Sequence, residues 1–176
     1  MSVRLLAISG SLRAVSTNTA LLKAAMLLQP AGMLIEFYEG LATLPHFNPD
    51  DDVAPLPPAV ADWRAKVAAA DGLLISSPEY ARGIPGSLKN ALDWLVSGPE
   101  HPGKPIAFFH ASERGVASQA ALRLVLETMG TRIIESACIT INLLGTEKDP
   151  ATVAANPDYA AKIRDALRAF SASISS

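Results

Sequence analysis

The chain has 176 residues, of which 49% are apolar, and its 15 basic residues nearly balance 17 acidic ones. This length fits one domain over residues 1–176, and the lack of a cationic surplus argues against a nucleic-acid partner. Neither a signal peptide nor an apolar run long enough to cross a bilayer is present, so we expect a soluble protein with no membrane partner. Because Cys138 is the only cysteine, the sequence predicts a cytoplasmic setting without disulfides, and we expect Cys138 to be a buried residue of a strand.

Short runs rich in apolar and β-branched residues alternate with longer segments of helical periodicity, which is typical of βαβ units. We expect strands at Val3–Ser9, Met33–Tyr38, Gly72–Ser77, Pro105–His110 and Arg132–Leu143. We expect helices at Asn18–Leu28, at Pro58–Ala70, after Ser87 as an N-cap, at Val116–Met129 and at Pro157–Ser171. This alternation predicts an α/β three-layer sandwich of the flavodoxin-like type, with strand order 2-1-3-4-5 and helices on both faces.

The turn after the first strand is rich in hydroxyl groups and opens a helix. In the predicted strand order, ligands bind beyond the carboxyl ends of the strands, so this turn faces the loop after the third strand. The backbone N–H groups that begin a helix lack partners within the helix and attract anions. The side chains able to complete such a site are Ser11, Arg13, Ser16, Thr17 and Asn18.

Neither a P-loop nor a G-x-G-x-x-G pattern is present, so a phosphate monoester fits better than a triphosphate or a pyrophosphate. The alternative interpretation is a helix that is merely capped by Ser or Thr, with Arg13 exposed to solvent, because helix caps use the same residue types.

The loop after the third strand, residues 77–86, combines a rigid Pro78, the aromatic Tyr80 and backbone amides at a strand end. Such a loop is suited to a flat heterocycle, whose polar edge the amides can contact. Tyr80 is a candidate wall for the ring, or else it packs on its own helix. Glu79 is either a ligand contact or a carboxylate that braces the loop.

Two motifs together make a resemblance specific. They are G-S-L-R-x-x-S-x-N at Gly10–Asn18 and S-P-E-Y-x-x-G-I-P-G-x-L-K-N-A-L-D-W-L at Ser77–Leu95, and with them the chain resembles the NADPH-dependent FMN reductase family. The resemblance implies noncovalently bound FMN, NADPH or NADH as donor and a homodimer or homotetramer. It implies that Ser11, Arg13, Ser16, Thr17 and Asn18 hold the FMN phosphate, and that Pro78, Glu79, Tyr80 and Ala81 line the isoalloxazine. Ser112, in the loop after the fourth strand, is a further candidate flavin contact.

On this basis we expect hydride transfer from NAD(P)H to FMN and then to a quinone, free flavin or similar small acceptor, in a ping-pong mechanism. A flavodoxin-type electron carrier and a noncatalytic flavin-binding protein are the alternatives. Ala81-Arg82 departs from the family, in which many members have Asn-Tyr or Asn-Gly at these positions. Arg82 and Arg114 are the basic groups nearest the expected site that are suited to the extra phosphate of NADPH.

Other residues suggest chemistry less strongly. We expect His101 and His110 to be structural residues rather than catalysts. His46 and the consecutive aspartates 50–52 share no metal-ligand spacing, so we expect a solvated loop or a subunit contact at Glu39–Pro57 and no metal site.

Overall fold

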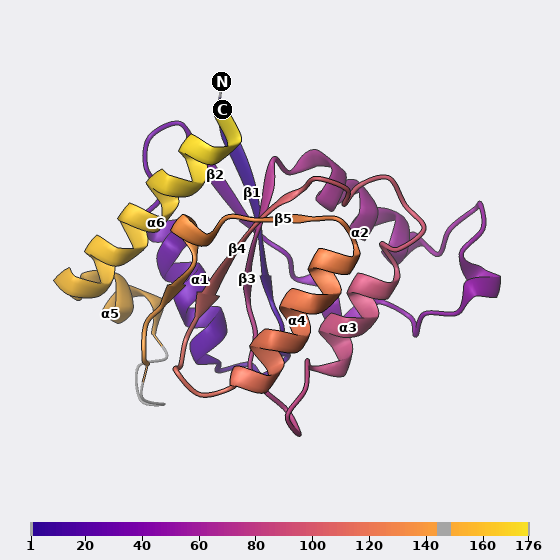
Figure 1. The fold of residues 1–176 in the computed structure, drawn as a ribbon, viewed down its shortest axis with the longest axis horizontal. Coiled ribbons are helices and arrows are strands. Elements are labelled where there is room, and N and C mark those ends of the chain that lie inside the picture. The colour runs from indigo at the N-terminus through magenta and orange to yellow at the C-terminus, as the bar shows by residue number, and fades with distance from the viewer. Residues whose placement is uncertain (1, 144–148, 176) are drawn as a thin grey trace.

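A parallel sheet forms the middle layer of the molecule (Figure 1). The computed structural model describes residues 2–143 and 149–175. The strand order is β2-β1-β3-β4-β5, with β6 also paired to β4, which confirms the predicted order and the flavodoxin-like fold. The strands are β1 (Val3–Ser9), β2 (Met33–Phe37), β3 (Gly72–Ser76), β4 (Pro105–His110), β5 (Arg132–Ile133) and β6 (Ile139–Thr140).

Helices cover both faces of the sheet, as predicted (Figure 1). On one face lie α1 (Thr17–Leu27), α5 (Pro150–Ala155) and α6 (Pro157–Ser175), and on the other lie α2 (Pro58–Ala69), α3 (Gly86–Asp93) and α4 (Val116–Thr128). Among the described residues, no helix combines the length and the apolar character that a membrane span requires.

The central strands are apolar at consecutive positions because both of their faces are buried. In β1, Leu5 and Ala7 belong to the core shared with α1 and α6, whereas Leu6 and Ile8 belong to the core shared with α2 and α3. Successive side chains of a strand point to opposite faces, so one apolar run supplies both cores.

The helices α1, α2 and α4 agree with the predicted ranges to within one residue at each end, and larger differences occur elsewhere. Pro85, not Ser87, is the N-cap of α3, and Ser87 lies inside the first turn. The short helix α5 was not predicted, although Asp149 caps it by accepting from the N–H of Thr152 at 2.9 Å. The last helix continues to Ser175 instead of ending at Ser171.

The predicted strand Arg132–Leu143 is wrong as a single element. The chain leaves β4 after Ile133, forms the 3-10 helix η3 (Glu135–Ala137) and returns to β4 as β6. Cys138 is half-buried and lies between η3 and β6, so its prediction as a buried residue of a strand is also wrong. At this interruption the N–H of Phe108 donates to Cys138 Sγ at 3.4 Å, and burial raises the pKa of that thiol.

The Glu39–Pro57 loop contains two short 3-10 helices, η1 (Gly40–Thr43) and η2 (Pro49–Asp51). The carbonyl oxygen of Pro45 accepts hydrogen bonds from Trp94 Nε1 at 2.8 Å and from Asn90 Nδ2 at 2.9 Å. These bonds attach the loop to the α3 region. Within residues 2–143 and 149–175, no three His, Cys, Asp or Glu side chains form a group that could hold a metal ion.

The outer strand β2 has a side-chain partner on its backbone. Gln29 Oε1, from the turn after α1, accepts a hydrogen bond from the N–H of Ile35 at 2.8 Å. At the other side of the sheet, β5 and β6 are two residues each.

Candidate cofactor site

Two adjoining cavities lie at the carboxyl ends of β1, β3 and β4. The β1 cavity has a volume of about 210 Å³, and its lining includes Ser11, Arg13, Ser16, Thr17, Asn18 and Tyr80. The β4 cavity has a volume of about 310 Å³, and its lining includes Glu79, His110, Ser112, Arg114, Gly115 and Gln119. Thr17, Asn18 and Pro78 line both cavities. The structure therefore brings together every predicted site residue except Ala81, which lines neither cavity.

The loops after β1 and β3 approach each other closely at Gly10. Its N–H donates to the carbonyl oxygen of Ser76 at 2.8 Å. A Cβ atom at Gly10 would lie 2.5 Å from Ser77 Oγ and 3.1 Å from Leu88 Cδ2. Only a residue without a side chain fits this contact, so Gly10 sets the spacing of the two loops.

The start of α1 presents hydrogen-bond donors to both cavities. Ser16 is the N-cap, and its Oγ accepts from the N–H of Thr19 at 3.4 Å, which leaves the hydroxyl proton available for an anion. The first turn carries no acidic side chain that would compete for such an anion. The side chain of Asn18 is held by β3, because Ser76 Oγ donates a hydrogen bond to Asn18 Oδ1 at 3.0 Å. The side-chain amide nitrogen of Asn18 can then donate to a ligand.

Ser11 and Arg13 complete the lining of the β1 cavity from the loop. Ser11 is 8% exposed, and its Oγ accepts from the N–H of Arg13 at 3.4 Å. The Arg13 side chain is exposed. A guanidinium at the rim of a cavity and several hydroxyl and amide donors inside it form a suitable environment for a phosphate.

The β3–α3 loop contains a tight turn with left-handed residues. The backbones of Tyr80 and Gly83 exchange two hydrogen bonds, of 3.1 and 2.9 Å, and φ is 49° at Ala81 and 61° at Arg82. Two successive left-handed residues define the turn type that favours Asn-Gly. Ala81 and Arg82 therefore adopt a strained backbone at the departure from the family motif.

The β4–α4 loop is ordered by Ser112, whose Oγ accepts from the N–H of Arg114 at 3.0 Å. Behind it, the carboxylate of Glu79 accepts from the N–H of Ser118 at 2.9 Å. Sequence analysis missed Ser118, because nothing in a helix-interior serine indicates a partner 39 positions earlier.

His110 also lines the β4 cavity, at the end of β4. Burial, together with the nearby Arg123 charge, lowers the pKa of His110 from 6.5 to about 4. The imidazole is therefore neutral at neutral pH and offers one donor and one acceptor to the cavity. Its position at a carboxyl strand end was the available sequence signal for this placement.

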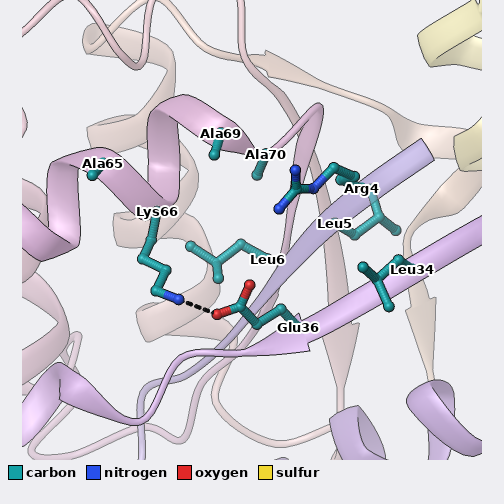
Figure 2. Close-up of a pocket in the computed structure, with 9 residues that line it drawn as sticks. All are labelled: Arg4, Leu5, Leu6, Leu34, Glu36, Ala65, Lys66, Ala69 and Ala70. Carbon is teal, nitrogen blue, oxygen red and sulfur yellow. Dashed lines mark hydrogen bonds and ion pairs between the residues drawn. The ribbon is translucent and has the colours of Figure 1, made fainter. Parts of the chain in front are cut away.

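Another hollow, the α2 groove, lies between α2 and the strands β1 and β2 (Figure 2). Its volume is about 250 Å³, and it is lined by Arg4, Leu5, Leu6, Leu34, Glu36, Ala65, Lys66, Ala69 and Ala70. Lys66 on α2 forms an ion pair with Glu36 on β2 across it. The hydrogen bond that Lys66 Nζ donates to Glu36 Oε1 raises the pKa of Lys66. None of the predicted site residues lies there.

The fold is flavodoxin-like, and the lining of its carboxyl-edge cavities includes hydroxyl, amide and guanidinium groups, which are suited to a phosphate. The profile of the NADPH-dependent FMN reductase family matches residues 3–144. The chain belongs to this family, and the predicted resemblance is confirmed.

Individual relatives agree with this assignment. The chain is 45% identical over 112 residues to an NAD(P)H-dependent FMN reductase of Pseudomonas aeruginosa, covering 62% of this chain and 60% of that protein, which is less than two thirds of its length. It is 30% identical over 150 residues to a quinone reductase of Escherichia coli, covering 81% and 79% of the two chains. The structure of the flavoenzyme NAD(P)H:(acceptor) oxidoreductase FerB from Paracoccus denitrificans aligns with a TM-score of 0.78 and 26% identity, over 98% of this chain and 97% of that one.

Proposed function

We propose that the chain is an FMN-dependent NAD(P)H oxidoreductase that transfers hydride from NAD(P)H to bound FMN and then to a quinone, free flavin or similar small acceptor. The observation that carries this proposal is the pair of adjoining cavities, one lined by residues with hydroxyl, amide and guanidinium groups and the other by the loops at the ends of β3 and β4. Family membership supports FMN as cofactor and NAD(P)H as donor.

The residues present fit an FMN phosphate in the β1 cavity. Ser11, Arg13, Ser16, Thr17 and Asn18 supply a guanidinium, hydroxyl and amide groups and the start of α1, and no acidic side chain occupies the first turn. Each charged hydrogen bond of this kind contributes on the order of 1.5–3 kcal/mol. The predicted phosphate contacts are therefore chemically matched to the ligand.

The ring would lie in the β4 cavity, against the Pro78-Glu79 segment and Ser112, with Tyr80 in the lining of the adjoining β1 cavity. When bound, FMN supplies the redox chemistry, and the protein supplies position and electrostatics. The neutral His110 offers a hydrogen bond without placing a positive charge in the cavity at neutral pH. Ala81 acts at most through its backbone, because it lines neither cavity.

Donor and acceptor would use one open site in turn, so we propose ping-pong kinetics. We also propose a homodimer or homotetramer in the cytoplasm. Exposed apolar side chains beside the site, at Leu12 (55%), Val15 (54%) and Tyr80 (48%), support self-association of this region.

An absorbance spectrum of the purified protein, followed by anaerobic addition of NADPH or NADH, tests the proposal. We expect a flavin spectrum that either donor bleaches, and parallel double-reciprocal plots with a quinone acceptor. A protein that stays colourless and binds no added FMN contradicts it. Bound flavin without steady NAD(P)H oxidation would instead identify an electron carrier or a noncatalytic flavin-binding protein.

A further inference from the structure

Helix α4 begins without a capping side chain of its own. Its N-cap is Gly115, in a left-handed conformation with φ of 94°. The first N–H groups of a helix need acceptors from outside it. Here the N–H of Ser118 donates to Glu79 Oε2 at 2.9 Å, so the acceptor comes from the loop after β3. A carboxylate at this end also interacts favourably with the helix dipole.

A second bond and a close contact join the same two segments. Ser118 is 3% exposed, and its Oγ donates to the carbonyl oxygen of Pro78 at 3.3 Å. A Cβ atom at Gly115 would lie 3.3 Å from Glu79 Cβ. The start of α4 is therefore packed directly on the Pro78-Glu79 segment, with little room for a side chain between them.

Both joined segments line the β4 cavity. Pro78 and Glu79 form one wall, and Ser112 and Gly115 belong to the other. The width of the cavity thus depends on the contact between Glu79 and the start of α4. A carboxylate used in this way braces the loop, which was one of the two roles that the sequence left open for Glu79.

We propose that Glu79 is a positioning residue, whose carboxylate caps α4 and thereby fixes the distance between the β3–α3 and β4–α4 loops around the cofactor. The proposal rests on the proposed function for its ligand, FMN. The capping itself is a property of the protein without ligand. Glu79 acts here through Ser118, and not through its charge on the ring.

The matched variants are Glu79→Gln, which keeps a side-chain oxygen as acceptor, and Glu79→Ala, which removes it. Loss of an N-cap side chain changes the equilibrium constant for forming the first turn of a helix by about ten-fold. We expect Glu79→Ala to raise the Kd for FMN about ten-fold and Glu79→Gln to raise it at most about two-fold. Glu113→Ala removes an exposed charge from the neighbouring loop and should leave the Kd unchanged.

Hydrogen exchange of the Ser118 amide in the FMN-free protein is the second readout. Protection should fall about ten-fold in Glu79→Ala and remain in Glu79→Gln. This measurement separates the two proposals, because it does not require FMN. If the wild-type protein binds no FMN, the proposed function fails while the exchange result still decides the role of Glu79.

Two results would overturn the proposal. One is unchanged exchange and FMN affinity in Glu79→Ala, and the other is a Glu79→Gln variant as impaired as Glu79→Ala, which would make the charge itself the active feature. If Glu79→Ala does not fold, Glu79→Met serves instead, because it keeps a side chain of similar length but has no oxygen to accept from the N–H of Ser118. We expect the same rise in Kd as in Glu79→Ala, and an unchanged Kd together with unchanged exchange would overturn the proposal.

Discussion

The carboxyl-edge cavities and the α2 groove have similar volumes, but their polar groups are paired differently. In the groove, Lys66 and Glu36 satisfy each other, and pairing raises the pKa of Lys66. In the β4 cavity, burial dominates and lowers the pKa of His110 to about 4. At the β1 cavity, the start of α1 has no acidic partner in its first turn. Polar groups that a protein buries or leaves unpaired beside a cavity indicate a ligand better than cavity size does.

The largest expected effect is that of Gly10→Ala at the carboxyl edge. The new Cβ would lie 2.5 Å from Ser77 Oγ, so the two ligand loops must move apart. We expect a loss of stability of about 1–3 kcal/mol and loss of FMN binding. Urea unfolding and flavin titration measure the two effects. Gly86→Ala is the matched control, because nothing lies within 4 Å of its Cβ position, and it should fold and bind as the wild type does.

The next effect is a pH dependence at His110. Its folded pKa of about 4 lies below the ordinary 6.5, so the unfolded chain binds a proton first as the pH falls. The stabilisation of the folded state that comes from a neutral His110 is fully present above pH 6.5 and is lost as the pH falls toward 4. Between pH 7 and 4.5, wild type should therefore lose about 2 kcal/mol more than His110→Gln in urea unfolding. Equal losses in the two proteins would show that His110 is not desolvated.

Arg13→Ala tests whether the two regions differ in ligand binding. Because the side chain is exposed, its contribution to a phosphate lies at the low end of the usual range, and we expect an about ten-fold higher Kd for FMN. Arg4→Ala removes an exposed arginine from the α2 groove and should leave this Kd unchanged. An equal effect of the two substitutions would remove the distinction, since it would indicate only general attraction between charges.

The smallest effect belongs to Lys66→Met in the α2 groove. The side chains of the Lys66–Glu36 pair are 39% and 44% exposed, and exposed pairs contribute little to stability. Because the pKa of Lys66 is raised, any contribution of the ion pair to folding stability is present below the ordinary lysine pKa. It is lost as the pH rises through the raised pKa. We expect an unchanged melting temperature at pH 7. A clear drop there would mean that the groove is more strongly coupled to the core than its exposure indicates.

The central strands could be predicted from the sequence because both of their faces are buried. The bounds of β1 and β4 agree with the predicted Val3–Ser9 and Pro105–His110. The break between β5 and β6 was not found in the same way, because Glu135 and Ser136 of η3 are only two polar residues within a segment, Arg132–Leu143, that is otherwise largely apolar or β-branched. Helix α5 did have a local signal, Asp149 followed by Pro150 at the first helical position.

The lining of the two carboxyl-edge cavities was predictable where its residues follow one another in a motif. The loop after β1 and the Pro78–Tyr80 segment both reach the cavities, as expected from their positions after neighbouring strands. The contact of Glu79 with Ser118 joins residues far apart in the chain, so no local pattern indicates it. The pKa of His110 likewise depends on burial and on Arg123, which only the folded structure brings near it.

The two edges of the sheet also bear on how the protein avoids aggregation. A free strand edge is a template on which another chain can extend a sheet. On one side Gln29 occupies the N–H of Ile35, and on the other the last strands are two residues each with η3 between them. The sheet thus offers little continuous backbone for intermolecular pairing, and Gln29→Ala should make fibril growth through β2 easier.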